Sequence, residues 1–278
     1  ENILQREYDS IEYFLSKYAT YDSFLKTNLS TIMDISKWGR QIILKKISPR
    51  AFTNMYNNIL TAKKIVEKVK EDAKIVEYVS FYKNDVCKIK IYCDEISQFI
   101  NNNIDLSSAL YIDQLQNFEI NFIKSGIDAD LDKQTQTLKE SELKLNSIAN
   151  YLSSLIEGKE KKSGKPNDYV KVHETEKNKY SLVSTSRRCK LLQDALPIEM
   201  ETVKLVYDSN STEKYDFKIS KKQFEFEKES ASNNFILDDQ ISCLCKNITK
   251  IKVSLKDLIT SVYNNFVVNF EVYQNKLE

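Results

Sequence analysis

Hydrophobic residues recur at every seventh position between residues 127 and 157. The leucines that keep this step are Leu131, Leu138, Leu145 and Leu152. Ile148 and Leu155 lie three places after the last two of them. A seven-residue repeat with a second apolar position inside it is typical of a helix that packs along a partner helix.

A second repeat with the same period covers residues 236–277. Its apolar positions are Ile241, Leu244, Ile248, Ile251, Leu255, Leu258 and Val262. The seam then moves by one residue to Ile259, Phe266 and Tyr273. Neither stretch contains proline, so each is expected to form one helix of roughly 30 to 40 residues, on the order of 45 to 60 Å long. The pattern predicts two long antiparallel helices that share a seam.

Between the two repeats, apolar and polar residues alternate in the way that is typical of strands. The alternating runs are 169–173, 180–185, 203–207 and 215–219, with Phe224 and Phe226 beyond them. Turn-forming residues lie at 175–178 and 209–213, and residues 191–196 before Pro197 are expected to form a short helix. The pattern predicts a small antiparallel sheet of about four strands, from which residues 230–234 lead into the return helix.

The chain before residue 126 has helical periodicity. Helices are expected over 9–25, from a cap at Ser30 or Thr31 to Lys46, and over 50–71, 75–100 and 107–118. The clearest start signal is Ser48 followed by Pro49, because serine caps a helix and proline fits its first position. Residues 86–92 also alternate like a strand, and helix is the preferred interpretation there. The fold class predicted for the whole chain is mainly α with a small β module.

Composition and charge exclude several classes of protein. Charged residues make up 29% of the 278 positions and there are only 4 Gly and 3 Pro, which favours long helices. The formal net charge is +1, so binding to nucleic acid would depend on local patches. No apolar run is long enough to span a membrane and no signal peptide is visible, so no membrane partner is expected. Five scattered cysteines predict a reduced, intracellular protein, with nucleus and cytoplasm both open.

No catalytic or metal-binding arrangement is predicted. His173 is the only histidine, which argues against histidine-based triads and metal sites. Cys243 and Cys245 are two residues apart on a helix, so they face different directions. Residues 128–132 begin like a calcium loop, but Lys133 and Lys139 stand where such a loop needs glycine and glutamate. Their acids are expected to lie in the first turn of a helix instead.

Short segments of the helical part are similar to motifs of one protein family. Residues 6–14 (REYDSIEYF) are similar to the sequence R-L-D-A-V-E-x-L. Residues 34–37 (DISK), followed by 48–50 (SPR), are similar to D-L-E-R and A-S-P-R-D-L at a similar interval. In this order the segments resemble the core of the MutS family of DNA mismatch repair ATPases.

The resemblance continues through the rest of the chain. Residues 123–132 (IKSGIDADLD) are similar to I-x-x-G-Y-D-x-E-L-D, which begins the descending lever helix of the family. The hairpin expected over 169–184 occupies the place of S-L-K-I-G-Y-N-K-V-F-G-Y-Y-I-E-V, without its glycines. Residues 233–239 (NNFILDD) lie where the family has E-R-Y-I-T-P-E, with Leu237 and Asp238 in place of threonine and proline.

The resemblance implies a fold and a role. The implied parts are a helical core (1–125), a descending lever helix (126–163), a β-rich clamp (164–235) and a returning lever helix (236–278). They imply a homo- or heterodimer whose clamps hold duplex DNA while the levers couple this grip to ATP and Mg²⁺ in an ATPase domain. The chain has no G-x-x-x-x-G-K-[ST] loop, and both Glu1 and Glu278 lie inside helical patterns. We therefore expect a fragment that is not itself an enzyme and holds no cofactor or metal, from a longer DNA-dependent ATPase.

The residues expected to contact DNA supply lysine cations and hydroxyl and amide donors, which hold phosphates without sequence preference. They are Lys177, Lys179, Lys221, Lys222, Lys228, Ser230, Ser232, Asn233 and Asn234. Further basic candidates are Lys159, Lys161, Lys162, Lys165, Arg187, Arg188, Lys190 and Lys218. Residues 164–235 contain 13 Lys and Arg against 12 Asp and Glu, so the module is not basic overall.

A second hypothesis fits the heptads and the near-zero net charge equally well. The chain would be a structural or tethering coiled-coil protein whose β module binds another protein. Exposed apolar residues on the outer face of the sheet favour this hypothesis. Lysines with Ser and Asn donors gathered at one end of the module favour DNA.

Overall fold

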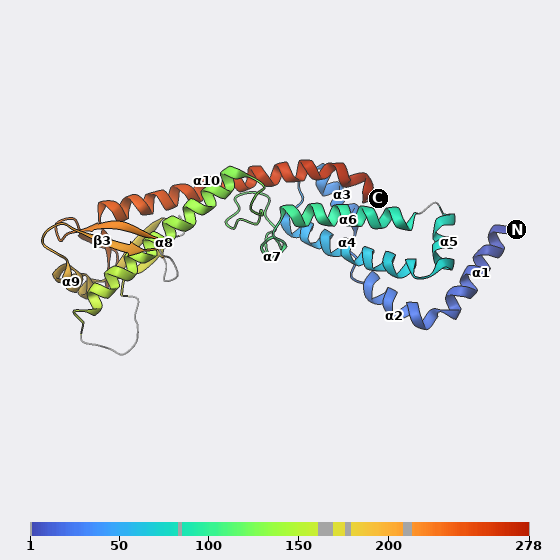
Figure 1. Cartoon of the computed structure of the whole chain (residues 1–278), viewed down its shortest axis with the longest axis horizontal. Coiled ribbons are helices and arrows are strands. Elements are labelled where there is room, and N and C mark those ends of the chain that lie inside the picture. The colour runs from blue at the N-terminus through green and yellow to red at the C-terminus, as the bar shows by residue number, and fades with distance from the viewer. Residues whose placement is uncertain (1, 83–84, 161–168, 176–178, 208–212, 278) are drawn as a thin grey trace. The chain divides into compact units, whose positions relative to one another are not determined.

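The computed structural model describes residues 2–82, 85–160, 169–175, 179–207 and 213–277 (Figure 1). The described chain is mainly helical with a small amount of antiparallel sheet, which confirms the predicted fold class at this level. No helix within these ranges combines the length and the apolar character that crossing a membrane requires.

The chain divides into two compact units. Unit 1 consists of Glu1–Asp128 and Asp257–Glu278, and unit 2 is Ala129–Lys256. The described helices of unit 1 before this boundary are α1 (Asn2–Ser16), α2 (Tyr18–Leu29), α3 (Ile35–Ile43), α4 (Pro49–Lys70), α5 (Ala73–Phe81), α6 (Val86–Asn103) and α7 (Leu106–Ala109). The long helix α10 (Asp239–Phe270) contributes residues to both units, and the 3₁₀ helix η1 (Glu271–Lys276) follows it.

Aromatic rings fill the centre of unit 1. Phe52 on α4 has its ring centroid 4.8 Å from that of Phe266 and 5.0 Å from that of Phe270, both on α10. Tyr263 is buried on the same helix, and its hydroxyl donates to the carbonyl oxygen of Ile47 at 2.8 Å. Because a buried hydroxyl needs a partner, this bond fixes the loop before α4 against α10.

The single helix expected over 9–25 is wrong, because the chain breaks at Lys17 between α1 and α2. The hydroxyls of Tyr13 and Tyr21 both donate to Asp72 Oδ2, at 2.6 and 3.4 Å. The two tyrosines come from different helices, so the chain has to bend for both to reach one carboxylate.

One predicted helix start is confirmed and another is wrong. Ser48 caps α4 and its hydroxyl accepts from the backbone N–H of Ala51 at 3.3 Å, with proline in the first helical position as expected. The cap of α3 is Asp34, whose carboxylate accepts from the first turn at 3.0 Å, and not Ser30 or Thr31. A carboxylate also suits the positive end of the helix dipole.

The helix expected over 107–118 is wrong beyond its first turn, which is α7. The backbone leaves the helical path there, because the carbonyl of Ile112 accepts from the N–H of Arg50 at 3.0 Å. Asn117 has a φ of 57°, in the left-handed region that ends regular helices. The helix expected over 75–100 is divided into α5 and α6, and Asp85 caps the second of them.

Unit 2 is built on two antiparallel helices, α8 (Ala129–Glu157) and the part of α10 up to Lys256. Ser254 near the end of this part donates its hydroxyl hydrogen to Gln134 Oε1 near the start of α8, at 2.7 Å. Leu145 and Leu152 of the predicted seam are buried in one core with Ile241 and Ile248. Within unit 2 the two heptad stretches therefore share a core.

A four-stranded antiparallel sheet packs on this helix pair. Its strands, in spatial order, are β1 (Lys171–Glu174), β2 (Tyr180–Thr185), β6 (Asn233–Leu237) and β5 (Glu225–Lys228). Leu182 lies opposite Ile236 in the register, and both are buried in the core of unit 2. β1 pairs antiparallel with β2, which confirms the hairpin expected there. The return helix, expected from residue 236, begins only at Asp239, and residues 233–237 form strand β6, whose Ile236 is buried.

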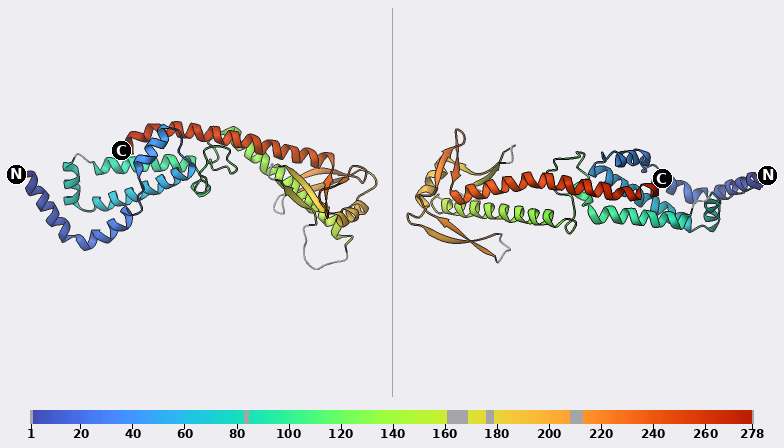
Figure 2. Two further views of the ribbon diagram at one scale, coloured as in Figure 1. Left: turned by 180° about the vertical axis from the view of Figure 1, so that it is seen from behind. Right: turned by 90° about the horizontal axis from the view of Figure 1, so that it is seen from above.

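The remaining strands do not join this sheet, although one sheet was expected. β3 (Glu201–Val206) and β4 (Lys214–Ile219) form a separate two-stranded ribbon, and α9 (Ser186–Ala195) lies between β2 and β3 in the chain. The ribbon is fixed to α8, because Ser147 Oγ donates to the carbonyl of Val206 at 2.6 Å and Tyr215 Oη donates to that of Lys144 at 3.0 Å. In Figure 2 (right) the ribbon and the four-stranded sheet lie on opposite sides of the α8–α10 pair.

Candidate nucleic-acid interface

Five of the residues expected to bind DNA lie together in the turn between β5 and β6. We call residues 228–234 the β5–β6 turn. It is closed by the hydroxyl of Ser230, which accepts from the N–H of Asn233 at 3.2 Å, and by the N–H of Ser230, which donates to the carbonyl of Asn233 at 3.1 Å. Lys228 lies opposite Asn234 in the register and is exposed. The turn therefore presents a cation, hydroxyls and amides on a short, hydrogen-bonded scaffold.

The start of α9 is joined to this turn. The N–H of Ser186 donates to the carbonyl of Ser232 at 2.9 Å, and the hydroxyl of Ser186 donates to Asn234 Oδ1 at 2.8 Å. The amide nitrogen of Asn234 and the hydroxyl of Ser232 have no hydrogen-bond partner among the described residues, so they remain available to an incoming oxygen. Ser186 was not predicted, because a serine between two regular elements has no distinguishing sequence signal.

Two guanidinium groups enter the same region from the first turn of α9. Arg187 and Arg188 both approach Glu160, which follows α8, and the Arg188 Nε lies 3.8 Å from Glu160 Oε2. The Arg188 guanidinium also lies over the ring of Tyr169, 4.4 Å from its centroid. The Arg187 side chain remains 73% exposed, whereas Glu160 is largely buried at 14%. One carboxylate therefore neutralises part of the positive charge beside the β5–β6 turn.

Lys221 and Lys222 belong to a second group, away from the β5–β6 turn. They follow β4, and the N–H of Lys221 donates to the carbonyl of Pro197, just beyond α9, at 2.7 Å. The Lys221 ammonium is 3.9 Å from Asp194, in the last turn of α9. Ser186 lies at the other end of this ten-residue helix, which spans about 15 Å at the usual rise. The seven residues expected before the return helix thus form two groups at opposite ends of α9.

Of the two lysines of the first hairpin, the structure describes only Lys179, and it lies in neither group. Lys177 lies outside the described residues. Lys179 is exposed, and its N–H donates to Thr175 Oγ1 at 3.3 Å. It precedes β2, whereas the β5–β6 turn lies beside the end of β2 at Thr185. Lys179 is therefore at the opposite end of the four-stranded sheet.

At that opposite end a polar cluster joins the sheet to both helices. The Lys252 ammonium lies 3.4 Å from Glu142 on α8 and 3.0 Å from Glu174 on β1, and it also hydrogen-bonds to Tyr180 Oη on β2. Burial lowers the pKa of Lys252, but its bonds to Tyr180 and Glu174 outweigh burial and raise the pKa overall. Burial raises the pKa of Tyr180 to about 12. The cluster thus keeps Lys252 charged and occupied with protein ligands.

The start of α10 is capped by Asp238. Asp238 Oδ1 accepts from the N–H groups of Gln240 and Ile241 at 2.9 and 3.2 Å, so the residue is an N-cap. Burial raises the pKa of this carboxyl, and Oδ2 has no partner among the described residues. The side chain of Gln240 in turn holds β4, donating to the carbonyl of Lys218 at 2.7 Å.

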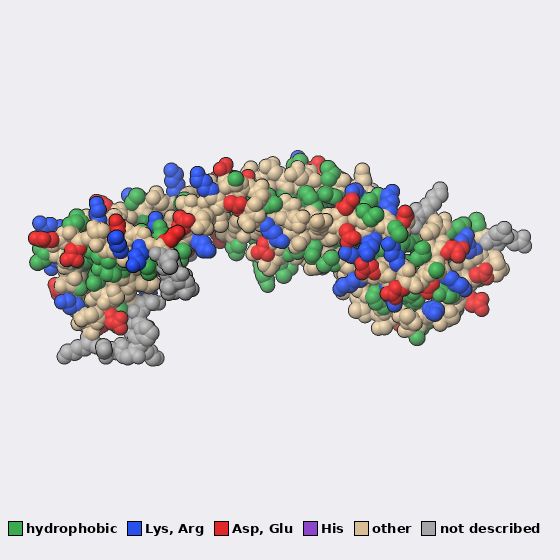
Figure 3. Space-filling view, in the orientation of Figure 1, with side chains coloured by type: hydrophobic (Ala, Val, Ile, Leu, Met, Phe, Trp, Pro, Cys, Tyr) green, Lys and Arg blue, Asp and Glu red, His purple; other side chains and the backbone are tan. Residues whose placement is uncertain are grey.

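Charges of both signs alternate on the face of unit 2 that is seen in Figure 3. This agrees with the near balance of charges counted in the sequence. Any hold on a polyanion would therefore come from small groups of residues such as the β5–β6 turn.

The described cysteines and carboxylates do not group into a metal site. Among the described residues, no three His, Cys, Asp or Glu side chains are grouped so that they could hold a metal ion. Burial raises the pKa of the Cys189 and Cys245 thiols to about 11, so both stay protonated and unreactive near neutral pH. Cys243 is exposed and faces away from Cys245, as their spacing predicts.

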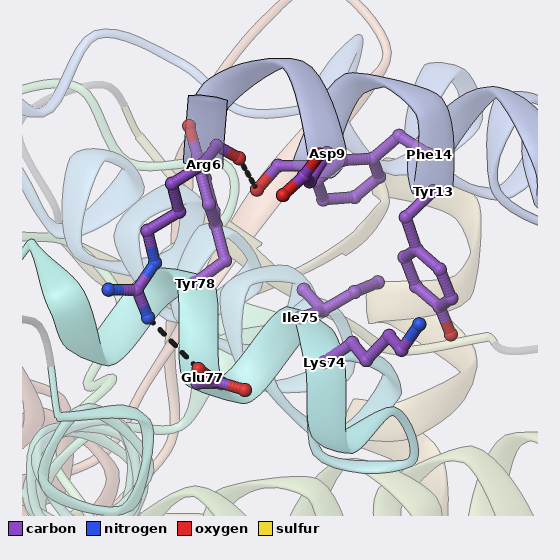
Figure 4. A pocket seen from close by; sticks show the side chains of 9 residues that line it. Arg6, Asp9, Tyr13, Phe14, Lys74, Ile75, Glu77 and Tyr78 are labelled. Carbon is purple, nitrogen blue, oxygen red and sulfur yellow. Dashed lines mark hydrogen bonds and ion pairs between the residues drawn. The ribbon is translucent and has the colours of Figure 1, made fainter. Parts of the chain in front are cut away.

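Two cavities lie in unit 1, and none of the residues expected to contact DNA lines them. One, of about 230 Å³, lies between α1 and α5 (Figure 4). An ion pair between Arg6 and Glu77, 3.0 Å apart, already joins its two walls. The other, of about 420 Å³, is lined by Trp38 and by Arg50, whose guanidinium is paired with Asp113. In each cavity one arginine is thus already paired with a carboxylate.

No protein family model matches the sequence, and no curated protein matches it.

Proposed function

We propose that unit 2 is the DNA-binding clamp of a MutS-like mismatch repair protein, and that it holds the backbone of duplex DNA without sequence preference. The observation that carries this proposal is the gathering of Lys228, Ser232 and Asn234 with the start of α9. Phosphate oxygens accept from lysine, hydroxyl and amide groups, and these are the groups that meet here. The motif order along the chain supports the same assignment.

The helices give the proposal its mechanical part. α8 and α10 carry the β module on a shared core, and α10 also contributes residues to unit 1. We assign to them the role of levers that couple DNA grip to ATP and Mg²⁺, which the resemblance places in a further domain of a longer, dimeric protein. This chain supplies binding and coupling in that scheme, and no chemical step.

The proposal predicts weak, salt-dependent binding to duplex DNA. The anisotropy of a labelled duplex should rise on addition of the folded chain, equally for matched and mismatched sequences. The association constant should fall steeply as NaCl increases from about 50 to 200 mM, because each phosphate contact releases counterions. Absent or salt-insensitive binding by a chain with native circular dichroism would contradict the proposal.

Single lysine substitutions test which residues of unit 2 contact DNA. Lys228→Gln should weaken binding on every sequence alike and lower the slope of the salt dependence by about 1. Lys222→Gln tests the second group in the same way. The matched control is Lys246→Gln, an exposed lysine on α10 that belongs to neither group. If all three variants bind like the original chain, these groups are not the DNA-binding site.

A protein-binding tether is the second candidate function, and one observation favours it. Ile198 and Met200, just before β3, are 77% and 54% exposed, and Val206 at the end of β3 is 39% exposed. Isolated apolar residues are common on surfaces, so the three together carry less weight than the polar groups at the β5–β6 turn. DNA binding that is lost on charge removal, but not in Ile198→Ser and Met200→Ser, would decide against the tether.

A further inference from the structure

The β3–β4 ribbon has one buried and one exposed face. Alternate residues of a strand point to opposite faces, so the register defines both sets. Val203, Leu205, Phe217 and Ile219 face the core of unit 2. The outward set is Thr202, Lys204 and Val206 on β3, with Lys214, Asp216 and Lys218 on β4. All six outward residues are exposed.

The outward face is positively charged. It carries three lysines and one aspartate, a net charge of +2 by this count. Lys204 lies directly opposite Asp216 in the register, yet their charged atoms are not within ion-pair distance. None of the three lysines has a carboxylate partner among the described residues. The face therefore differs from the β5–β6 turn, where Glu160 neutralises part of the charge.

The spacing of the lysines suits an extended row of negative charge. Lys214 and Lys218 are four residues apart on one strand, about 13 Å, and the strand that carries Lys204 runs about 5 Å away. Duplex DNA carries one negative charge per about 1.7 Å of its axis, so it can engage all three lysines at once. The inner face packs on the core of unit 2, so the outer face is the one available to the duplex backbone.

We infer that the exposed face of the β3–β4 ribbon, through Lys204, Lys214 and Lys218, is a second contact surface for the phosphate backbone of duplex DNA. The inference rests on the proposed function of unit 2 and names a site that it does not include. Lys204 and Lys214 lie in strands of mixed charge, and only their common outward direction reveals them as a group.

A different role for the same lysines has to be tested beside it. The edges of a two-stranded ribbon are partly unpaired, and exposed lysines protect such edges from pairing with other chains. That role predicts self-association when the lysines are neutralised and no change in DNA affinity of the monomer. The two roles are therefore distinguished by measuring both quantities.

The experiment compares two triple variants of the full chain by anisotropy with the same labelled duplex. Lys204→Gln, Lys214→Gln and Lys218→Gln together should reduce affinity at least tenfold and lower the salt slope by up to about 2.7, three contacts at about 0.9 each. The control combines Lys139→Gln, Lys246→Gln and Lys250→Gln, which removes three exposed charges from α8 and α10 and should change both values much less. Circular dichroism and sedimentation establish that each variant is folded and monomeric.

Each result has one meaning. An unchanged affinity in the ribbon variant, while Lys228→Gln weakens binding, overturns the ribbon site and leaves the proposed function standing. An equal loss in both triple variants also overturns it, because net charge alone would then explain the effect. Failure of the unaltered chain to bind duplex overturns the proposed function and this inference together.

Discussion

At the scale of single residues, the surface around the β5–β6 turn is limited by one acid. Glu160 is held between two arginines whose guanidinium groups would otherwise face solvent beside the turn. Its side chain is only 14% exposed, so its ion pairs with the arginines are more shielded from solvent than those of an exposed carboxylate. The local positive charge is therefore smaller than the sequence suggests.

Replacing this acid should strengthen DNA binding. Glu160→Gln removes a negative charge and releases Arg187 and Arg188 toward the phosphates, so affinity should rise severalfold and the salt slope should increase by about 1. The matched control is Glu157→Gln, an exposed acid at the end of α8. Anisotropy titrations at several salt concentrations measure both. Equal changes in the two variants would show that Glu160 has no special position.

At the scale of the elements, a carboxylate holds three helices of unit 1 together. Asp72 Oδ1 caps α5 by accepting from the N–H of Lys74 at 3.1 Å, and Oδ2 accepts from Tyr13 on α1 and Tyr21 on α2. The hydrogen bond from Tyr13 is the main cause of the lowered pKa of Asp72. The same bond raises the pKa of Tyr13 to about 12.

This cap predicts a definite pH dependence. A carboxyl whose pKa is lower in the folded than in the unfolded chain stabilises the fold above the unfolded pKa, about 3.9, and loses this effect as pH falls through the folded value. Asp72→Ala should lower the free energy of unfolding by about 1 kcal/mol at pH 7, the usual value of an N-cap. Urea denaturation should show the difference shrinking below pH of about 4. Asp72→Asn keeps the cap without the charge, so its free energy of unfolding relative to Asp72→Ala should be much the same at pH 7 and below pH of about 4. A steep pH dependence of this difference would refute the assignment.

The sequence predicted those elements whose signals are local. Ser48 with Pro49 placed the start of α4, and strand β2 begins and ends where the alternation of residues 180–185 does. Residues 233–237 were missed as a strand because their pairing with β2 joins residues about 50 positions apart. Asp34 and Asp72 were missed as caps because several polar residues nearby could serve equally well.

The candidate site was predicted less completely than the fold. Residue type identified Lys228 and Asn234, but it could not separate Lys221 from them, because their distance depends on where α9 packs. Nor could it show that Arg187 is paired with Glu160. Side-chain partners across a fold follow from tertiary packing, which leaves no periodic trace in the sequence.

At the scale of the whole molecule, the two units have separate cores. The core of unit 2 includes Ile241 and Ile248 from the first part of α10. That of unit 1 includes Tyr263, Phe266 and Phe270 from its last part. The only tryptophan, Trp38, is buried in unit 1, so its fluorescence reports on that unit alone.

Because α10 supplies residues to both cores, the units should unfold cooperatively. Melting one core would release half of a helix on which the other depends, and helix formation is itself cooperative along the chain. Ile248→Ala, a cavity costing about 2 to 5 kcal/mol in unit 2, should therefore lower the denaturation midpoint reported by Trp38 in unit 1. Lys250→Ala, at an exposed position of the same helix, should leave it unchanged. If Ile248→Ala leaves the denaturation midpoint reported by Trp38 unchanged, the two units fold independently although they share one helix.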